Sequence, residues 1–378
     1  VSPMIVKAEQ NDLKIDYRYT EVGTDVVVTE AEAGLWDANT DEDKRADFRF
    51  YVEDNLMTFE DDPTFVVDEN GFAIEDGVLL SYQGDAESVV IPDGVTEIGE
   101  WAFSSCSNIS EIVIPDSVTV IKSFAFNGCS SLTEIVIPDS VTEIKEYAFN
   151  GCSSLTDIVI PNSVTEIKGG AFSGCSSLTN VVLPNSLTEM EFAMFDNCSS
   201  LIKIEIPNSV TSLENAVFSN CSSLTEIIIP NSVTTIGSDA FKGTKWLENK
   251  RAENPLVIVN SILVDGQTAT GKVTIPNTVT KIADFAFDLS TLTEVVIPNS
   301  VTVIKDGVFS ECSNLVEVTI PGSISEIPMF AFYRCTNLEK VTISDGVTAI
   351  KDVAFDNCVS LKNINLPSTL KTIGQSAF

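Results

Sequence analysis

The sequence of 378 residues contains no histidine and few basic residues. Without histidine it lacks the commonest general base of enzymes and the commonest ligand of zinc sites. Its 22 lysine and arginine residues face 55 aspartate and glutamate residues, for a formal net charge of −33. This charge repels phosphate backbones and anionic lipid heads, so nucleic acid and membrane surfaces are poor partners. No apolar run approaches the roughly 18 residues that a membrane span needs, so membrane insertion is not expected.

Hydrophobic residues make up 44% of the chain, enough for a large core. Prolines recur 23 residues apart over most of its length, and phenylalanines keep the same step. The prolines are Pro92, Pro115, Pro138, Pro161, Pro184, Pro207, Pro230, Pro276, Pro298, Pro321 and Pro367. The phenylalanines are Phe103, Phe126, Phe149, Phe172, Phe195, Phe218, Phe241, Phe287, Phe309, Phe332, Phe355 and Phe378. Because the prolines and the phenylalanines recur with the same period, the sequence indicates a repeat architecture. Its units must stack on one another to bury their apolar faces.

One unit, residues 132–154, reads LTEIVIPDSVTEIKEYAFNGCSS. The alternation in it predicts a strand in which Ile135 points inward while Glu134 and Val136 point outward. Pro138 has no N–H for a ladder and ends that strand. A second extended segment follows at 141–144, and a tight or 3₁₀ turn at 148–151. The fold expected is a repeat solenoid, a right-handed leucine-rich-repeat superhelix with a concave parallel β-sheet, short strands, 3₁₀ turns and few helices.

The recurring IPxSVTxI, AFxxC and SSLTEIxIP segments resemble the BspA-type leucine-rich repeat family of bacterial surface proteins. The resemblance covers roughly residues 72–378. It implies a secreted or cell-surface location and an adhesive or host-protein-binding role. It brings no catalytic residue and no cofactor. The chain opens at Val1 rather than Met, so the lack of a visible signal peptide does not argue against secretion.

Four regions are expected along the chain. Residues 1–70 form an acidic N-terminal β module or a cap on the first coil, and the cap is favoured because an open solenoid end needs a polar cover. Residues 71–243 form a first repeat array, 244–275 an irregular helix plus β-hairpin, and 276–378 a second array. Hairpin turns are expected at Asp76-Gly77 and Asn260-Ser261. The basic cluster beside the helix is interpreted as a solvated helix face rather than a docking patch; it comprises Lys242, Lys245, Lys250 and Arg251.

All nine cysteines fall in one repeat column: Cys106, Cys129, Cys152, Cys175, Cys198, Cys221, Cys312, Cys335 and Cys358. Their number is odd and their Cβ vectors are parallel, which favours a buried ladder of free thiols over disulfides. Zinc is not expected, because CxxC pairs and histidine are missing. A weak calcium candidate remains at Asp37, Asn39, Asp41 and Asp43. However, Glu42 and Phe48 stand where an EF-hand has glycine and glutamate, so an acidic turn is favoured and no cofactor is expected.

The predicted strands present two outward columns in the first array. The candidate binding residues are Glu111, Val113, Glu134, Val136, Asp157, Val159, Asn180 and Val182. Exposed valines suit a parallel ladder through β-propensity alone, yet a contiguous exposed apolar strip often marks a binding site. Both interpretations remain open. The acidic column repeats without one distinguished pair in a pocket, so no enzyme is expected.

Three hypotheses for function follow. The favoured one is a non-enzymatic, secreted or surface-displayed module that binds a protein partner, such as a host extracellular protein, on its concave sheet. The alternative is a rigid stalk that presents the N-terminal module or flanking domains. Carbohydrate binding ranks lower, because the strand columns contain no tryptophan or tyrosine. The C-terminal coil ends at Phe378, and exposed apolar surface there invites end-to-end self-association.

Overall fold

A computed structural model of the chain describes residues 18–21, 24–27 and 66–378. The chain divides into two compact units, Val1–Phe65 and Val66–Phe378. In the first unit, β1 (Arg18–Glu21) pairs antiparallel with β2 (Thr24–Val27). The calcium candidates lie outside the described residues: Asp37, Asn39, Asp41 and Asp43. Whether residues 1–70 act as a cap stays a prediction.

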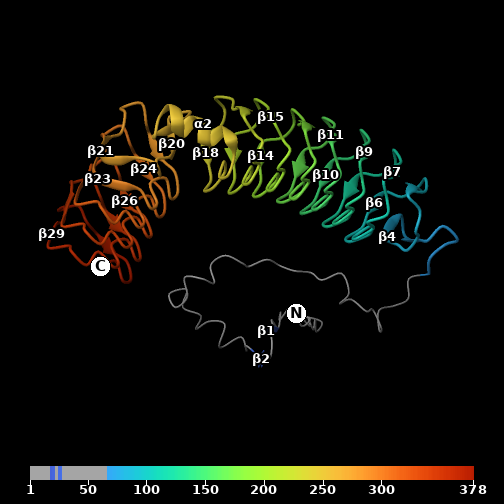
Figure 1. The fold of residues 1–378 in the computed structure, drawn as a ribbon, viewed down its shortest axis with the longest axis horizontal. Helices are drawn as coiled ribbons and strands as arrows, with labels where there is room; N and C mark the ends of the chain where they lie inside the picture. The colour runs from blue at the N-terminus through green and yellow to red at the C-terminus, as the bar shows by residue number, and fades with distance from the viewer. Residues whose placement is uncertain (1–17, 22–23, 28–65) are drawn as a thin grey trace. The chain divides into compact units, whose positions relative to one another are not determined.

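The unit Val66–Phe378 is a solenoid whose coils follow one another along an arc (Figure 1). Each coil begins with a strand, and these strands form the long-strand face. A proline follows the strand in every coil but one, where Ser344 stands after β27 (Lys340–Ile343). The first array contributes β5 (Ser88–Val90), β7 (Glu111–Val113), β9 (Glu134–Val136), β11 (Asp157–Val159), β13 (Asn180–Val182), β15 (Lys203–Glu205) and β17 (Glu226–Ile228). The second contributes β21 (Thr270–Thr274), β23 (Thr291–Val296), β25 (Glu317–Ile320), β27 (Lys340–Ile343) and β29 (Asn363–Asn365). Neighbouring coils pair these strands in parallel and one repeat apart, as in Val113 with Val136.

After the proline turn, a two-residue strand forms the second side of each coil, the short-strand face. In the first array these strands are β6 (Glu97–Ile98), β8 (Val120–Ile121), β10 (Glu143–Ile144), β12 (Glu166–Ile167), β14 (Glu189–Met190), β16 (Ser212–Leu213) and β18 (Thr235–Ile236). In the second they are β22 (Lys281–Ile282), β24 (Val303–Ile304), β26 (Glu326–Ile327), β28 (Ala349–Ile350) and β30 (Thr372–Ile373). Ile144 and its equivalents point inward and are buried, except Ile373 in the last coil, which is exposed.

The third side is a ladder of tight turns that stack backbone on backbone. Within a turn the bonds join residues three apart, as from Cys129 N–H to the Phe126 carbonyl (3.2 Å). Between coils, the N–H groups of Phe124, Phe126 and Gly128 donate to carbonyls of the next coil at 3.0, 2.8 and 2.8 Å. We call this side the turn ladder. The predicted repeat solenoid of parallel strands and tight turns with few helices is confirmed.

The prediction of a concave sheet needs a correction, because the long strands lie on the outer side of the arc. In Figure 1 the labels β7, β9, β11 and β15 follow its outer edge, with β6, β10 and β14 further in. The turn ladder repeats its three bonds at each step of the first array, whereas long-strand pairing is interrupted between β9 and β11 and between β13 and β15. The backbone bonds between coils thus run without interruption along the turn ladder, whereas they are interrupted along the long strands on the outer side of the arc.

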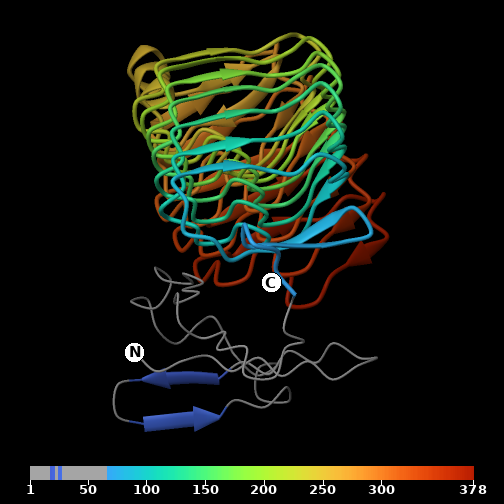
Figure 2. The same ribbon diagram turned by 90° about the vertical axis from the view of Figure 1, so that its right-hand side faces the viewer.

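The coils stack on one another along the solenoid (Figure 2), and equivalent buried side chains form columns between them. The rings of Phe126 and Phe149 stack with centroids 5.1 Å apart and planes 9° apart, and this arrangement repeats along both arrays. The predicted thiol ladder is confirmed, because all nine cysteines are free. The Cys152 thiol donates to the carbonyl of Phe126 in the preceding coil (3.2 Å). Burial raises the pKa of the Cys175 thiol to about 12, so this thiol is not a reactive thiolate at neutral pH.

A fixed junction joins the two arrays. Thr244 replaces the column cysteine and caps α2 (Lys245–Glu253) by accepting from the N–H of Leu247. A hairpin follows, β19 (Val257–Val259) and β20 (Ile262–Asp265), with the predicted turn at Asn260 and Ser261. The Asn260 amide donates to the carbonyls of Pro230 (2.7 Å) and Val233 in the last coil of the first array. The second array is thus tied directly to the first.

The same hairpin begins the first array, where β3 (Phe72–Glu75) pairs with β4 (Val78–Tyr82) about the predicted turn at Asp76 and Gly77. Both turn residues have positive φ (48° and 81°), as a type I′ turn requires. Among the described residues, no helix is both long enough and apolar enough to cross a membrane.

Candidate binding surface

An apolar stripe runs along the long-strand face of the first array. It consists of one outward valine from each of five successive coils: Val90, Val113, Val136, Val159 and Val182. These side chains are 46% to 70% exposed, whereas their inward neighbours are buried, with Ile135 at 5%. The four valines that the alternation predicted all point outward, and Val90 extends the row by one coil. We call these five residues the valine stripe.

Carboxylates flank the valine stripe on both sides. On one side lies the predicted column of Glu111, Glu134 and Asp157, continued by Asn180, all of them exposed. On the other side, the residue after each proline is also exposed, and in three successive coils it is aspartate: Asp93, Asp116 and Asp139. This second acidic row was not singled out from the sequence. Its signal was the repeated Pro-Asp pair.

The lysines of these coils do not neutralise the two acidic rows. Between residues 88 and 182 the basic residues are Lys122, Lys145 and Lys168. All three pair with glutamates of the short-strand face, as in Lys122 with Glu97 (2.7 Å). The valine stripe therefore lies in a field of negative charge.

The stripe ends abruptly at the sixth coil. There β15 carries Lys203 and Glu205 in the two outward positions, and Lys203 pairs with Glu226 at 2.8 Å. In the second array the acidic column is interrupted by lysines that pair across the ladder, as Lys272 does with Glu294 (2.7 Å). The apolar and acidic pattern is thus continuous only over the first five coils, and it recurs singly at Glu226 with Ile228 and at Glu294 with Val296.

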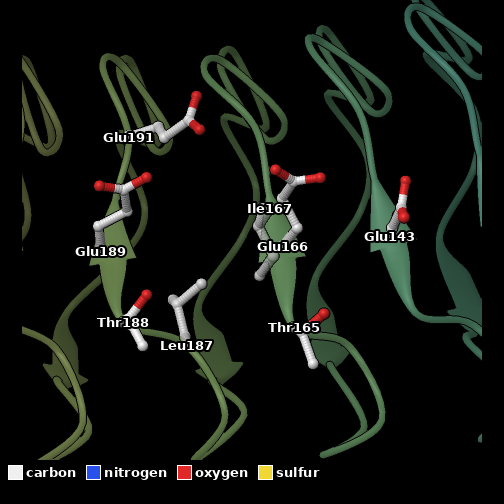
Figure 3. Close-up of a pocket in the computed structure, with 8 residues that line it drawn as sticks. All are labelled: Glu143, Thr165, Glu166, Ile167, Leu187, Thr188, Glu189 and Glu191. Carbon is white, nitrogen blue, oxygen red and sulfur yellow. The ribbon is translucent and has the colours of Figure 1, made fainter.

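A hollow of about 340 Å³ opens on the short-strand face, where β12 and β14 do not pair (Figure 3). It is lined by Glu143, Thr165, Glu166, Ile167, Leu187, Thr188, Glu189 and Glu191. Lysines beside it bridge these carboxylates, and Lys168 with Lys145 lowers the pKa of Glu166. A carboxyl held ionised in this way is a poor general acid. No group of three potential metal ligands occurs among the residues that the structure describes.

A row of aromatic side chains lies beside the turn ladder, outside the strand columns, with Trp101 exposed and Phe124 and Tyr147 half-buried. Trp101 and Phe124 stack with centroids 4.1 Å apart, and Phe124 and Tyr147 follow at 5.1 Å. Gly170 makes room for the ring of Tyr147, because a Cβ at Gly170 would lie 2.2 Å from that ring. The rings cover one another's faces, so the row does not offer the open ring faces on which sugars stack. Its signal in the sequence was an aromatic residue before three successive Ala-Phe pairs.

The family described as "BspA type Leucine rich repeat region" matches this chain in six copies, at residues 79–169, 146–263 and 265–378. The chain belongs to this family. The resemblance seen in the repeated segments is confirmed. A comparison with curated proteins gave no match.

Solved structures of bacterial repeat proteins are similar to this BspA-type chain. A leucine-rich repeat protein from Bacteroides ovatus is 27% identical, with 79% of each chain covered and a TM-score of 0.49. A leucine rich cell surface protein from Faecalibacterium prausnitzii is 30% identical over 80% of this chain and 92% of its own, with a TM-score of 0.48. The T. pallidum leucine rich repeat protein is 36% identical over 45% of this chain and 81% of its own, with a TM-score of 0.43.

Proposed function

We propose that this protein is a non-enzymatic binding module, secreted or displayed on a bacterial surface, that holds a protein partner on the long-strand face of its first array. The observation that carries the proposal is the valine stripe between two acidic rows. An exposed apolar strip across five coils is unfavourable in free energy in water, and a partner that covers it would remove this penalty. The location is supported by family membership and by the similar cell-surface protein of Faecalibacterium prausnitzii.

Two substitutions test the long-strand face directly. Val136→Lys combined with Val159→Lys places two charges in the centre of the stripe, and we expect binding of a protein partner to weaken at least about tenfold. The measurement is surface plasmon resonance against a panel of extracellular host proteins. The control is Val303→Lys with Val316→Lys, which changes two exposed valines outside the stripe by the same charge. Unchanged binding by the folded stripe variant would exclude this face as the site.

The rigid-stalk alternative assigns binding to the N-terminal module or to flanking domains. The unit Val66–Phe378 is compact by itself, so a chain that begins at Val66 separates the two hypotheses. Under our proposal this shortened chain keeps partner binding, and under the stalk hypothesis it loses it. The stacked faces of the aromatic row give carbohydrate binding no added support.

The C-terminal coil presents the apolar surface that the sequence predicted. Phe378 and Ile373 are each 51% exposed and Val359 is 78% exposed, beside a hollow of about 460 Å³. End-to-end self-association through this coil stays a prediction.

A further inference from the structure

The chemistry of the long-strand face also restricts the kind of segment that fits on it. We propose that the partner lays an amphipathic α-helix along the valine stripe, with an apolar ridge flanked on both sides by lysine or arginine. The inference rests on the proposed function, because it describes the occupant of that same surface.

The spacing of the stripe matches a helix better than an extended segment. Successive valines belong to successive coils, whose long strands lie about 4.8 Å apart where they pair; β9 and β11 do not pair, so this distance is a lower bound for the step from Val136 to Val159. A helix rises about 5.4 Å per turn and presents one ridge residue in each turn. An extended segment repeats the same face only every ~6.6 Å, so its side chains lose register with the valines within two coils. A helix parallel to the stripe drifts by only about 0.6 Å per coil, or about half a coil over the four steps, so its ridge of about four residues stays close to the row of five valines.

The two acidic rows specify the flanks of that helix. Glu111, Glu134 and Asp157 lie on one side of the valines, and Asp116 and Asp139 on the other. Long lysine or arginine side chains on both flanks of an apolar ridge reach the two rows while their stems cover the valines. Acidic flanks would be repelled on both sides. Charge complementarity thus selects a basic helix and not merely an apolar one.

The extent of the stripe sets the length of the helix. From Val90 to Val182 there are four coil steps, or about 19 Å. A helix covers that distance in about 13 residues. The stripe lies on the convex outer edge of the arc, so no other part of the solenoid lies above it to block a straight helix (Figure 1). Beyond it, Lys203 repels a basic flank and Glu205 replaces the apolar contact.

Synthetic peptides test the inference on the full chain. The probe is a 14-residue amphipathic Leu/Lys peptide; the comparisons are a scrambled peptide of the same composition and a Leu/Glu peptide of the same pattern. Fluorescence anisotropy measures the affinity of each. We expect the amphipathic Leu/Lys peptide to bind at least about tenfold more tightly than the scrambled one, and the Leu/Glu peptide not to bind. Raising the salt from 50 to 500 mM should weaken binding about tenfold.

Matched variants locate the site. Val136→Thr with Val159→Thr keeps the β-branched shape and removes apolar surface, and we expect about fivefold weaker binding. Glu111→Gln with Glu134→Gln should weaken it about three- to tenfold. The controls are Val303→Thr with Val316→Thr, and Glu100→Gln with Glu189→Gln, which alter exposed residues elsewhere. They should change affinity less than twofold.

Two results would overturn the inference. Equal binding of the scrambled peptide, or equal losses in the control variants, would mean that the peptide responds to the net charge of −33 and not to the stripe. A failure of the helical peptide while Val136→Lys with Val159→Lys still abolishes binding of a protein partner would reject the helix and leave the proposed function intact.

Discussion

Replacing Phe149 with alanine should lower the free energy of unfolding by about 3–5 kcal/mol. This ring is fully buried and stacks on Phe126 and Phe172 at 5.1 and 5.3 Å, so its removal leaves a cavity that two coils share. The backbone around it is fixed by the turn ladder, because the Phe149 N–H donates to the Ala171 carbonyl at 2.8 Å. The cavity therefore has little freedom to collapse. Urea unfolding followed by circular dichroism measures the effect.

The control is the same substitution at the end of the same column. Phe378 is 51% exposed and stacks only on Phe355 among the described residues, so Phe378→Ala should cost about 1 kcal/mol. Equal losses at the two positions would mean that stacking between coils does not determine the stability of the column.

Replacing Asp265 with alanine should have the second largest effect, about 2–4 kcal/mol. Asp265 is 6% exposed, and it accepts from Arg251 Nε (2.8 Å) and from a terminal nitrogen of the same guanidinium (2.5 Å). Gln267 accepts a further bond from Arg251 at 2.8 Å. Removing the carboxylate leaves a half-buried guanidinium whose pair is lost, at the junction that holds the two arrays together.

We expect the Asp265→Ala variant to unfold in two steps, because arrays that contact each other only through nearest coils lose cooperativity when one interface weakens. Differential scanning calorimetry measures this. Glu253→Ala removes the exposed partner of Lys250 in the same helix and should cost no more than about 0.5 kcal/mol. A single sharp transition at an unchanged temperature in the Asp265 variant would show that the ion pair does not fasten the junction.

The sequence was sufficient for the features that depend on the repeat period. A fixed step places Ile135 and its equivalents inside, exposes Val136 and its equivalents, and aligns the cysteines. The two hairpin turns were also predictable, since Asp76-Gly77 and Asn260-Ser261 adopt the positive φ values that such turns need. Family membership followed from the same repeated segments.

The curvature was not predictable from the period, because the period is the same on every side of a coil. The uninterrupted bonds between coils lie on the turn ladder, where they join backbone groups and leave no pattern of side chains. The partners of the basic residues near α2 likewise depend on geometry. Lys245 and Lys250 are exposed and pair with Glu248 and Glu253, whereas Arg251 pairs with the buried Asp265. That this cluster is a solvated helix face rather than a docking patch stays a prediction.

The central claim is that equivalent side chains of successive coils lie in register and make the valine stripe one continuous surface. Spin labels on Val90→Cys and Val182→Cys test it, because eight of the nine native thiols are buried and burial raises the pKa of the half-buried Cys106 to about 12. Double electron–electron resonance should give one narrow distance distribution at roughly 20–25 Å, the span of four coil steps on the outer edge. A broad distribution, or one centred beyond about 35 Å, would contradict the stacking of the columns and the surface built on it.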